Sequence, residues 1–266
     1  MRVMTWNVWW RFGGNWRDRR HGIAQTVAAC RPDLLGLVEA WSGAGTDQAR
    51  ELAAPHRMHA VWAPSGLPPE PDPAEYADQA GIAIGIGLVS RWPIRATELT
   101  DLPNPQRGGV PPRALLATVD HPAGPLHVIT ACTEWEPRYA ADHRAQCAAL
   151  ADLATDRRLD GDLPVLLIGD LNVAPDQPEF APLAATMTDT WVAGGGDPAA
   201  VTLDSAVPFA PVEAVKQLDR RIDHILARPG RPGSPVRVEK AFLAGHHPIA
   251  DVLPSDHYAV VTDIPL

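Results

Sequence analysis

The chain has 266 residues, of which 45% are hydrophobic and 21% are charged. These proportions are ordinary for a globular protein and exclude a disordered chain, a collagen and a coiled coil. We expect residues 1–266 to form a single domain, because this length suits one large α/β unit. We also expect no transmembrane segment and no signal peptide, since no apolar run approaches the roughly 18–20 residues that a membrane span needs.

The charge balance argues against tight, non-specific binding to nucleic acids. Lys and Arg number 23 against 32 Asp and Glu, a net charge of −9, whereas such binding depends on basic side chains that neutralise phosphates. The three cysteines, Cys30, Cys132 and Cys147, form no Cys-x-x-Cys pair and are too few for a disulfide framework. A reducing, cytoplasmic location is expected, and no sequence feature indicates an obligate protein partner.

The first half of the chain predicts two strand-and-helix units, a long loop and a series of strands. The strands of the two units are expected at Arg2 to Val8 and Leu34 to Val38, and their helices at Asp18 to Cys30 and Thr46 to Ala54. The proline-rich, acidic stretch from Ala63 to Gln79 predicts a surface loop that could act as a lid. Closely spaced strands are then expected at residues 81–90, 94–99, 113–119 and 126–130.

The second half returns to a helix followed by strands. An alanine-rich helix is predicted from Tyr139 to Thr155, followed by an apolar strand from Leu163 to Ile168. Further strands are expected at residues 221–227, 236–243 and 258–264. The two halves favour an α/β fold in which two sheets pack face to face with helices outside.

Several apolar strands end in, or lie next to, a polar side chain. These side chains are Asn7, Glu39, Asp170, Asn172, Asp223, Asp256 and His257. Each one alone is most simply explained as the place where a sheet meets water, but together they provide the oxygen ligands that Mg²⁺ takes. Because alternate residues of an extended chain point the same way, Asp170 and Asn172 are expected to share one cleft. Zinc is disfavoured, since the chain has no His-Glu-x-x-His motif and no sulfur-rich cluster.

The ordered set of motifs resembles the endonuclease/exonuclease/phosphatase superfamily. Glu39 follows an apolar strand, and the remaining motifs are TWN (5–7), GLVSRWPI (87–94), GDLN (169–172), RIDHIL (221–226) and SDH (255–257). A single match of this size arises by chance, but the ordered set spans nearly the whole chain. The resemblance implies a four-layer α/β sandwich, two packed mixed β-sheets flanked by helices, with the active site at one end of the sheets.

The resemblance also implies a role for each motif residue. Asn7 and Glu39 would bind a divalent metal, Mg²⁺ or alternatively Mn²⁺, and Asp256 would share in this site. The catalytic residues would be four. Asp170 would orient or deprotonate the attacking water, Asn172 would hold the phosphate, and His257 would contact the phosphate with Asp223 hydrogen-bonded to its other nitrogen.

One position departs from the family pattern. Many members have a histidine in a Thr-His-Leu motif where this chain has Cys132 or one of its neighbours. Cysteine cannot serve as a cationic donor, so this function could pass to Glu134, Arg144 or Arg113, among which the sequence does not choose. Arg113 and Arg144 are therefore candidate substrate-binding residues.

Aromatic residues flank the expected site. Trp10 lies near Asn7 and Trp135 lies after Cys132, so both are candidates for a pocket wall that stacks a base, a sugar or an acyl chain. Arg17, Arg19 and Arg20 are interpreted as the solvated face of a helix.

The leading hypothesis is a divalent-metal-dependent phosphoester hydrolase, a phosphodiesterase or phosphatase in which water attacks a phosphate ester. Its partner would be a phosphoester substrate, either a small or lipid-like molecule or a nucleic acid. A DNA or RNA nuclease of the same superfamily is the alternative. A catalytically weak phosphoester-binding module is a further alternative, motivated by Cys132.

Overall fold

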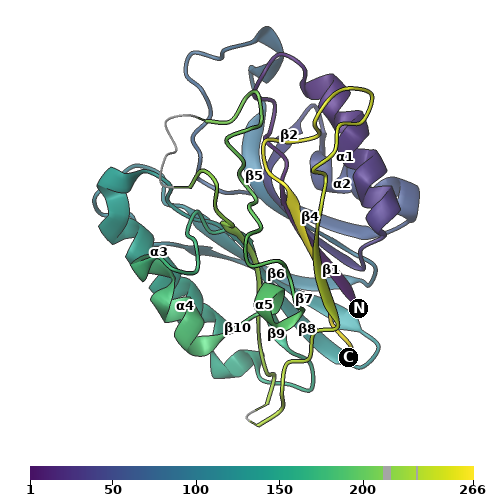
Figure 1. Cartoon of the computed structure of the whole chain (residues 1–266), viewed down its shortest axis with the longest axis vertical. Coiled ribbons are helices and arrows are strands. Elements are labelled where there is room, and N and C mark those ends of the chain that lie inside the picture. The colour runs from purple at the N-terminus through teal and green to yellow at the C-terminus, as the bar shows by residue number, and fades with distance from the viewer. Residues whose placement is uncertain (212–216, 232) are drawn as a thin grey trace.

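Two β-sheets packed face to face form the centre of the molecule (Figure 1). The computed structural model describes residues 1–211, 217–231 and 233–266. In these residues the first sheet has seven strands in the order β12-β13-β1-β2-β5-β4, with β3 paired to β2, and the second has six in the order β10-β11-β9-β8-β7-β6. The strands of the first sheet are β1 (Arg2–Asn7), β2 (Leu34–Gly43), β3 (Thr46–Asp47), β4 (His59–Pro64), β5 (Ala83–Ser90), β12 (Lys240–Ala244) and β13 (Ala259–Asp263). Those of the second are β6 (Ile94–Asp101), β7 (Arg113–His121), β8 (Gly124–Cys132), β9 (Val165–Asp170), β10 (Thr188–Asp189) and β11 (Asp223–Arg228).

Helices cover the outer face of each sheet. The helices are α1 (Trp16–Cys30), α2 (Gln48–Ala53), α3 (Ala140–Ala154), α4 (Ala181–Thr186) and α5 (Thr190–Ala193). Short 3₁₀ turns lie at Ala54–His56, Ala77–Gln79, Pro137–Tyr139, Arg157–Leu159 and Pro178–Phe180. No helix in the described parts of the chain is long and apolar enough to span a membrane.

Strand alternation explains the layering. Val3 of β1 faces the second sheet and packs in one apolar core with Ile168 of β9, whereas its neighbour Met4 faces outward and packs against Ile23 of α1. On the other side, α3 and α4 pack their apolar side chains against the outer face of β8 and β9. The four-layer α/β sandwich predicted from the sequence is therefore confirmed.

The predicted elements differ from the observed ones mainly at their ends. The strand expected to stop at Val38 continues to Gly43, because a bulge between Leu37 and Ala40 lets Glu39 interrupt the apolar run without ending the pairing with β5. The strand β4 and the short helices α4 and α5 were not predicted. The strand expected from Val236 begins at Lys240.

The topology brings several strand ends to one end of the molecule. β1 runs parallel to β2, and β8 runs parallel to β9, so that Cys132 lies beside Asp170. β11 runs antiparallel to β9 and begins at Asp223, directly opposite Asp170. The polar residues that end these strands therefore meet at a single place.

Candidate active site

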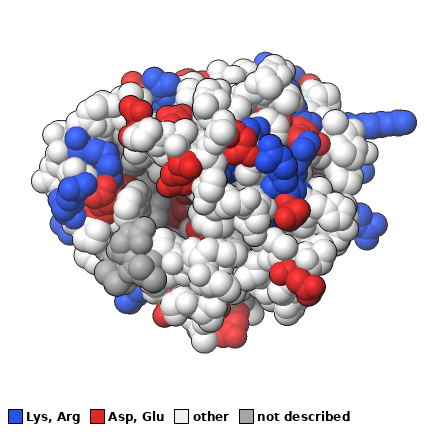
Figure 2. Space-filling model, turned by 90° about the horizontal axis from the view of Figure 1, so that it is seen from above, with Lys and Arg blue, Asp and Glu red and all other residues white. Residues whose placement is uncertain are grey.

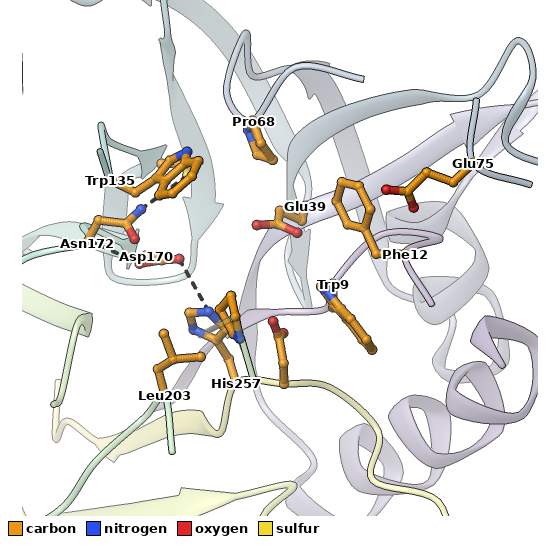
Figure 3. Close-up of a pocket in the computed structure, with 13 residues that line it drawn as sticks. Trp9, Phe12, Glu39, Pro68, Glu75, Trp135, Asp170, Asn172, Leu203 and His257 are labelled. Atoms are coloured by element: carbon orange, nitrogen blue, oxygen red, sulfur yellow. Dashed lines mark hydrogen bonds and ion pairs between the residues drawn. The ribbon is translucent and has the colours of Figure 1, made fainter. Parts of the chain in front are cut away.

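A cleft of about 330 Å³ lies at this end of the two sheets. Its polar lining residues are Glu39, Cys132, Asp170, Asn172, Asp256 and His257, and Glu75 joins them from the loop that follows β4. The apolar lining residues are Trp9, Phe12, Pro68, Trp135, Leu203 and Pro211. In Figure 3, Glu39, Asp170 and His257 lie together at its centre, and Trp135, Pro68 and Phe12 surround them.

Asp170 lies at the centre of the polar group. Asn7 Nδ2 donates to Asp170 Oδ2 at 3.0 Å and also to Glu39 Oε1 at 2.9 Å. The backbone N–H of Asn172 donates to Asp170 Oδ1 at 3.0 Å. Gly169 precedes Asp170 in β9 and allows this strand to approach β8 closely, because a Cβ at that position would lie 1.9 Å from the carbonyl oxygen of Ala131. The GDLN motif thus holds a buried carboxylate against β8 and aims it into the cleft.

His257 forms a buried chain of interactions with two carboxylates. Asp223 Oδ2 lies 2.8 Å from His257 Nδ1, the hydrogen bond that the resemblance implies, and His257 Nε2 lies 3.9 Å from Asp170 Oδ2. Burial alone would lower the pKa of His257, but the charges of Asp223, Asp170 and Asp256 outweigh it and raise this pKa well above its ordinary value. The imidazole is therefore a cation at neutral pH and presents Nε2 to the cleft.

The SDH motif is anchored to β1. Ser255 Oγ donates to the carbonyl oxygen of Asn7 at 2.7 Å and accepts from the backbone N–H of His257 at 3.3 Å. Trp6 Nε1 donates to the carbonyl oxygen of His257 at 2.9 Å. These contacts hold residues about 250 positions apart in the sequence at one site, since the separation of Ser255 from Asn7 is 248 residues.

The side chain of Asn172 lines the cleft, but its amide nitrogen is already engaged by the backbone of Thr133. Asn172 Nδ2 donates to the carbonyl oxygen of Thr133 at 2.9 Å and lies 3.9 Å from Cys132 Sγ. Thr133 O can only accept, so the amide nitrogen must face it, and the amide oxygen lies on the side of Asp170 (Figure 3). The sequence-based role of Asn172, holding phosphate through N–H groups, would require this amide to leave Thr133.

The donor set on the other side of Asp170 fits a divalent cation. Burial, and next the charge of Asp256, raise the pKa of Glu39 to about 8, and burial raises the pKa of Asp256. For these two neighbouring acids the cost of burial outweighs the favourable charges, those of His257 on both and of Arg19 on Asp256, so a further cation would stabilise their ionised forms, and oxygen atoms are the ligands of hard cations. Asp170, Asp223 and His257 also place possible ligand atoms within 4.8 Å of one another. Because Asp223 occupies His257 Nδ1, Glu39 and Asp256 with Asn7 are the better candidate ligands.

Divalent cation should therefore stabilise the fold in a pH-dependent manner. Since the folded-state pKa of Glu39 is raised, the free energy of unfolding without metal falls as the pH rises from about 4.5 to about 8. We expect saturating Mg²⁺ to raise Tm by about 5 °C at the upper end of this range and by much less at the lower end. Glu39→Gln should raise Tm of the metal-free protein near pH 8 and abolish the Mg²⁺ effect, whereas Glu239→Gln, an exposed control, should do neither. The Tm values would be measured by calorimetry. If Mg²⁺ raised Tm equally in Glu39→Gln and in the parent protein, the metal would have to bind elsewhere.

Three other candidate residues do not line the cleft. Trp10 is 2% exposed and donates from Nε1 to the carbonyl oxygen of Ala83, so its neighbour Trp9 faces the cleft instead. Arg113 pairs with Asp101 at 3.0 Å, and Arg144 lies among alanines on the surface of α3. The expectation that Trp10, Arg113 and Arg144 contact substrate is therefore not supported by their positions, whereas Trp135 does line the cleft.

Cys132 does lie at the site, as the last residue of β8. Burial raises the pKa of its thiol well above the ordinary value, so it is a neutral group. Glu134 was suggested, with Arg113 and Arg144, as a substitute for the family histidine. It is fully buried, and its carboxylate accepts hydrogen bonds from Arg107 at 2.6 and 2.8 Å. None of the three suggested substitutes reaches the cleft.

Arg19 overturns the interpretation of the arginine cluster on α1. Its side chain is 1% exposed, and its guanidinium donates to carbonyl oxygens of Val8, Trp9, Trp10 and Phe12. Burial lowers the pKa of Arg19 to about 10. This arginine shapes the loop that carries Trp9 and Phe12 into the cleft. Arg17 and Arg20, in contrast, are exposed on the solvated face of the helix as predicted, where they pair with Asp78 and Glu51.

Sequence reasoning missed most of the apolar wall. Trp9 was passed over in favour of Trp10, and no motif pointed to Phe12, Leu203 or Pro211. A signal did exist for Pro68 and for the acidic lining residue Glu75, because the proline-rich stretch from Ala63 to Gln79 contains both. The predicted loop thus contributes to the cleft.

Comparison with known proteins identifies the family. The model of the "Endonuclease/Exonuclease/phosphatase family" matches residues 4–257, and the chain belongs to this family. No curated protein sequence matches it.

Among solved structures, the catalytic domain of human Nocturnin with a bound sulfate anion has a TM-score of 0.75 at 17% identity, covering 100% of this chain and 94% of that one. TDP2 from D. rerio, complexed with a single-strand DNA product, has a TM-score of 0.74 at 18% identity, covering 100% and 99%. An endonuclease/exonuclease/phosphatase from Beutenbergia cavernae DSM 12333 has a TM-score of 0.70 at 25% identity, covering 100% of this chain and 71% of that chain.

Proposed function

We propose that this protein is a divalent-metal-dependent phosphoester hydrolase with Asp170 as its general base. The observation that carries the proposal is the placement of a buried carboxylate between an imidazolium, 3.9 Å away, and an asparagine that links it to Glu39. General acid–base catalysis needs groups of this kind converging on one cleft. Membership in the family supports a phosphoester as the substrate class.

The protonation states suit water attack near neutral pH. Burial, and next the charge of Asp223, raise the pKa of Asp170 to about 7, which is close to the optimum for a general base at that pH. Asp170 would take the proton of the attacking water, and His257 Nε2 would donate to a phosphate oxygen. Asp223 would keep the imidazole oriented through Nδ1.

Asn7, Glu39 and Asp256 would hold the metal, for which Mg²⁺ is our proposal and Mn²⁺ the alternative. A bound divalent cation would supply charge neutralisation at the phosphate. The residues at this site provide oxygen atoms as metal ligands, and the raised pKa of Glu39 supports the binding of a cation.

Hydrolysis of a substrate panel tests the proposal. The panel comprises bis-p-nitrophenyl phosphate, p-nitrophenyl phosphate, sphingomyelin, plasmid DNA and single-stranded RNA, each with Mg²⁺, with Mn²⁺ and with EDTA. We expect metal-dependent release of product from at least one phosphoester and no release in EDTA. Cleavage that persists in EDTA would contradict the metal requirement.

A binding module is the second candidate, favoured by the neutral thiol of Cys132, because this chain has Cys132 or one of its neighbours where many family members have a histidine. It predicts that Mg²⁺ binds but that no member of the panel is turned over. The variant Cys132→His distinguishes the hydrolase from the binding module. A module that lost cleavage only because it lacks the histidine side chain should gain cleavage in this variant. If Cys132→His also stays silent while Mg²⁺ still binds, the hydrolase proposal fails.

A further inference from the structure

The cleft is lined by more acidic than basic side chains, which is unusual for a site that binds an anion. Among the lining residues described by the structure, Glu39, Glu75, Asp170 and Asp256 are acidic, and His257 is the only one that forms a cation. Figure 2 views the end of the molecule that holds these loops and shows a hollow with acidic side chains in it and beside it. A bound divalent cation and the imidazolium therefore face at least four carboxylates.

The arginines around the cleft are already paired with other groups. Arg107, on the loop between β6 and β7, binds Glu134 and Glu136, and Arg19 is committed to backbone carbonyls. The other ion pairs in the surrounding loops are Arg17 with Asp78, Arg138 with Glu136, and Arg220 with Asp176. Recruiting any of these cations to a substrate would break an existing ion pair or leave carbonyls without donors.

The apolar wall of the cleft is firmly supported. Trp9 stacks on Phe209 with ring centroids 4.5 Å apart. The backbone of Trp135 is held from both sides, since its N–H donates to Glu134 Oε1 at 2.9 Å and its carbonyl oxygen accepts from Gln217 Nε2 at 2.5 Å. A group that fills this part of the cleft meets rigid aromatic and proline surfaces, which favour apolar atoms over charged ones.

Glu75 extends the negative charge to the mouth. Its backbone N–H is held by Gln79 Oε1 at 2.9 Å, and its carboxylate points toward the ring of Phe12 in Figure 3. A substrate that extends past Phe12 therefore passes a carboxylate. Any negative charge on that part of the substrate would be repelled by this exposed carboxylate.

We infer that the substrate is a phosphodiester monoanion whose second ester group is apolar and carries no further negative charge. The inference rests on the proposed hydrolase function and names the substrate class of that same cleft. A diester adds one negative charge to the cleft, whereas a phosphate monoester adds two and a polynucleotide adds one with every residue. The second ester group, which a monoester lacks, is the part that the apolar wall binds.

Substrates that share one leaving group test the inference. We would measure kcat/KM at about pH 8 with Mg²⁺, where the monoester is a dianion, for p-nitrophenyl phosphate, bis-p-nitrophenyl phosphate and thymidine 5′-(p-nitrophenyl phosphate). The fourth substrate is the last compound with an added 3′-phosphate. We expect about a hundred-fold preference for bis-p-nitrophenyl phosphate over the monoester, and about a ten-fold loss on adding the 3′-phosphate.

Charge reversal at the mouth separates electrostatics from intrinsic reactivity. Glu75→Lys should reduce the 3′-phosphate discrimination about ten-fold, because the repelling carboxylate becomes a cation. Asp152→Lys makes the same change in net charge on the exposed surface of α3 and should leave the discrimination within about two-fold.

The outcomes distinguish this inference from the proposed function. Metal-dependent turnover that favours the monoester or the 3′-phosphorylated compound would overturn the inference and leave the hydrolase intact. The same holds if Glu75→Lys and Asp152→Lys behave alike. No turnover of any of the four compounds would overturn the inference, and the hydrolase proposal would fail with it only if sphingomyelin, plasmid DNA and single-stranded RNA also stayed intact.

Discussion

Replacing Asp170 with asparagine should lower kcat for a phosphodiester by about a thousand-fold. The amide has nearly the same shape as the carboxylate, and its oxygen can still accept the hydrogen bond from the Asn172 N–H. It cannot accept a proton from water, so the loss falls on the chemical step rather than on KM. The measurement is steady-state kinetics on the preferred substrate of the panel, together with a thermal melt.

The melt and a matched control make this result decisive. Burial raises the pKa of Asp170 to about 7, so its charged form is a full cost to the fold above that pH. Removing this cost offsets the hydrogen bond from Asn7 that the amide nitrogen cannot accept, so Asp170→Asn should change Tm little. Asp176→Asn makes the same chemical change in the next loop, where Asp176 is exposed and pairs with Arg220, and should retain parent activity. Near-parent kcat in a folded Asp170→Asn protein would remove Asp170 from the role of base.

Replacing Asp223 with asparagine should move the pH–rate profile of kcat/KM to lower pH by about one unit. The charge of Asp223 raises the pKa of His257, so its removal lets the imidazolium lose its proton at a lower pH, and the alkaline limb moves down. The same charge raises the pKa of Asp170, so the acidic limb moves down as well. Activity should therefore fall most at alkaline pH.

The direction of this shift is the test, because a merely structural effect would lower the whole profile without moving it. Profiles between about pH 5 and pH 10 for the parent, for Asp223→Asn and for Asp251→Asn would supply it, since Asp251 is exposed and lies outside the cleft lining. A shift of either limb to higher pH would mean that Asp223 does not act on these two groups. An unchanged profile would mean the same.

Much of the fold followed from local patterns in the sequence. The alternation and continuous apolar runs that define β1, β2, β8 and β9 are properties of short segments, and they were predicted with end errors of a few residues. The strand β4 was not predicted, because it is mostly half-exposed and ends in Pro64, which locally favours a loop. The bulge at Glu39 was not predicted, because an acidic residue after an apolar run normally ends a strand.

Local sequence patterns do not predict which aromatic residues form the wall of the cleft. Trp9 and Trp10 are adjacent and chemically identical, and their sequence neighbours give no basis for choosing between them. Positive φ values of 54° and 30° in this loop turn Trp9 to the cleft and Trp10 into a pocket beside Trp41. The buried guanidinium of Arg19, whose sequence context suggests a solvated helix face, accounts for that loop shape.

The sequence by itself determined the layers of the fold and the set of polar residues at the strand ends, because hydrophobic periodicity and motif order are encoded along the chain. Only the tertiary structure decided which side chains share the cleft and what charge they give it. The sequence did not choose among Arg113, Arg144 and Glu134, whereas the structure shows Arg113 and Glu134 in ion pairs and Arg144 on the surface of α3. Pairing, burial and side-chain direction depend on contacts between segments far apart in the chain, and no local pattern of residues encodes those contacts.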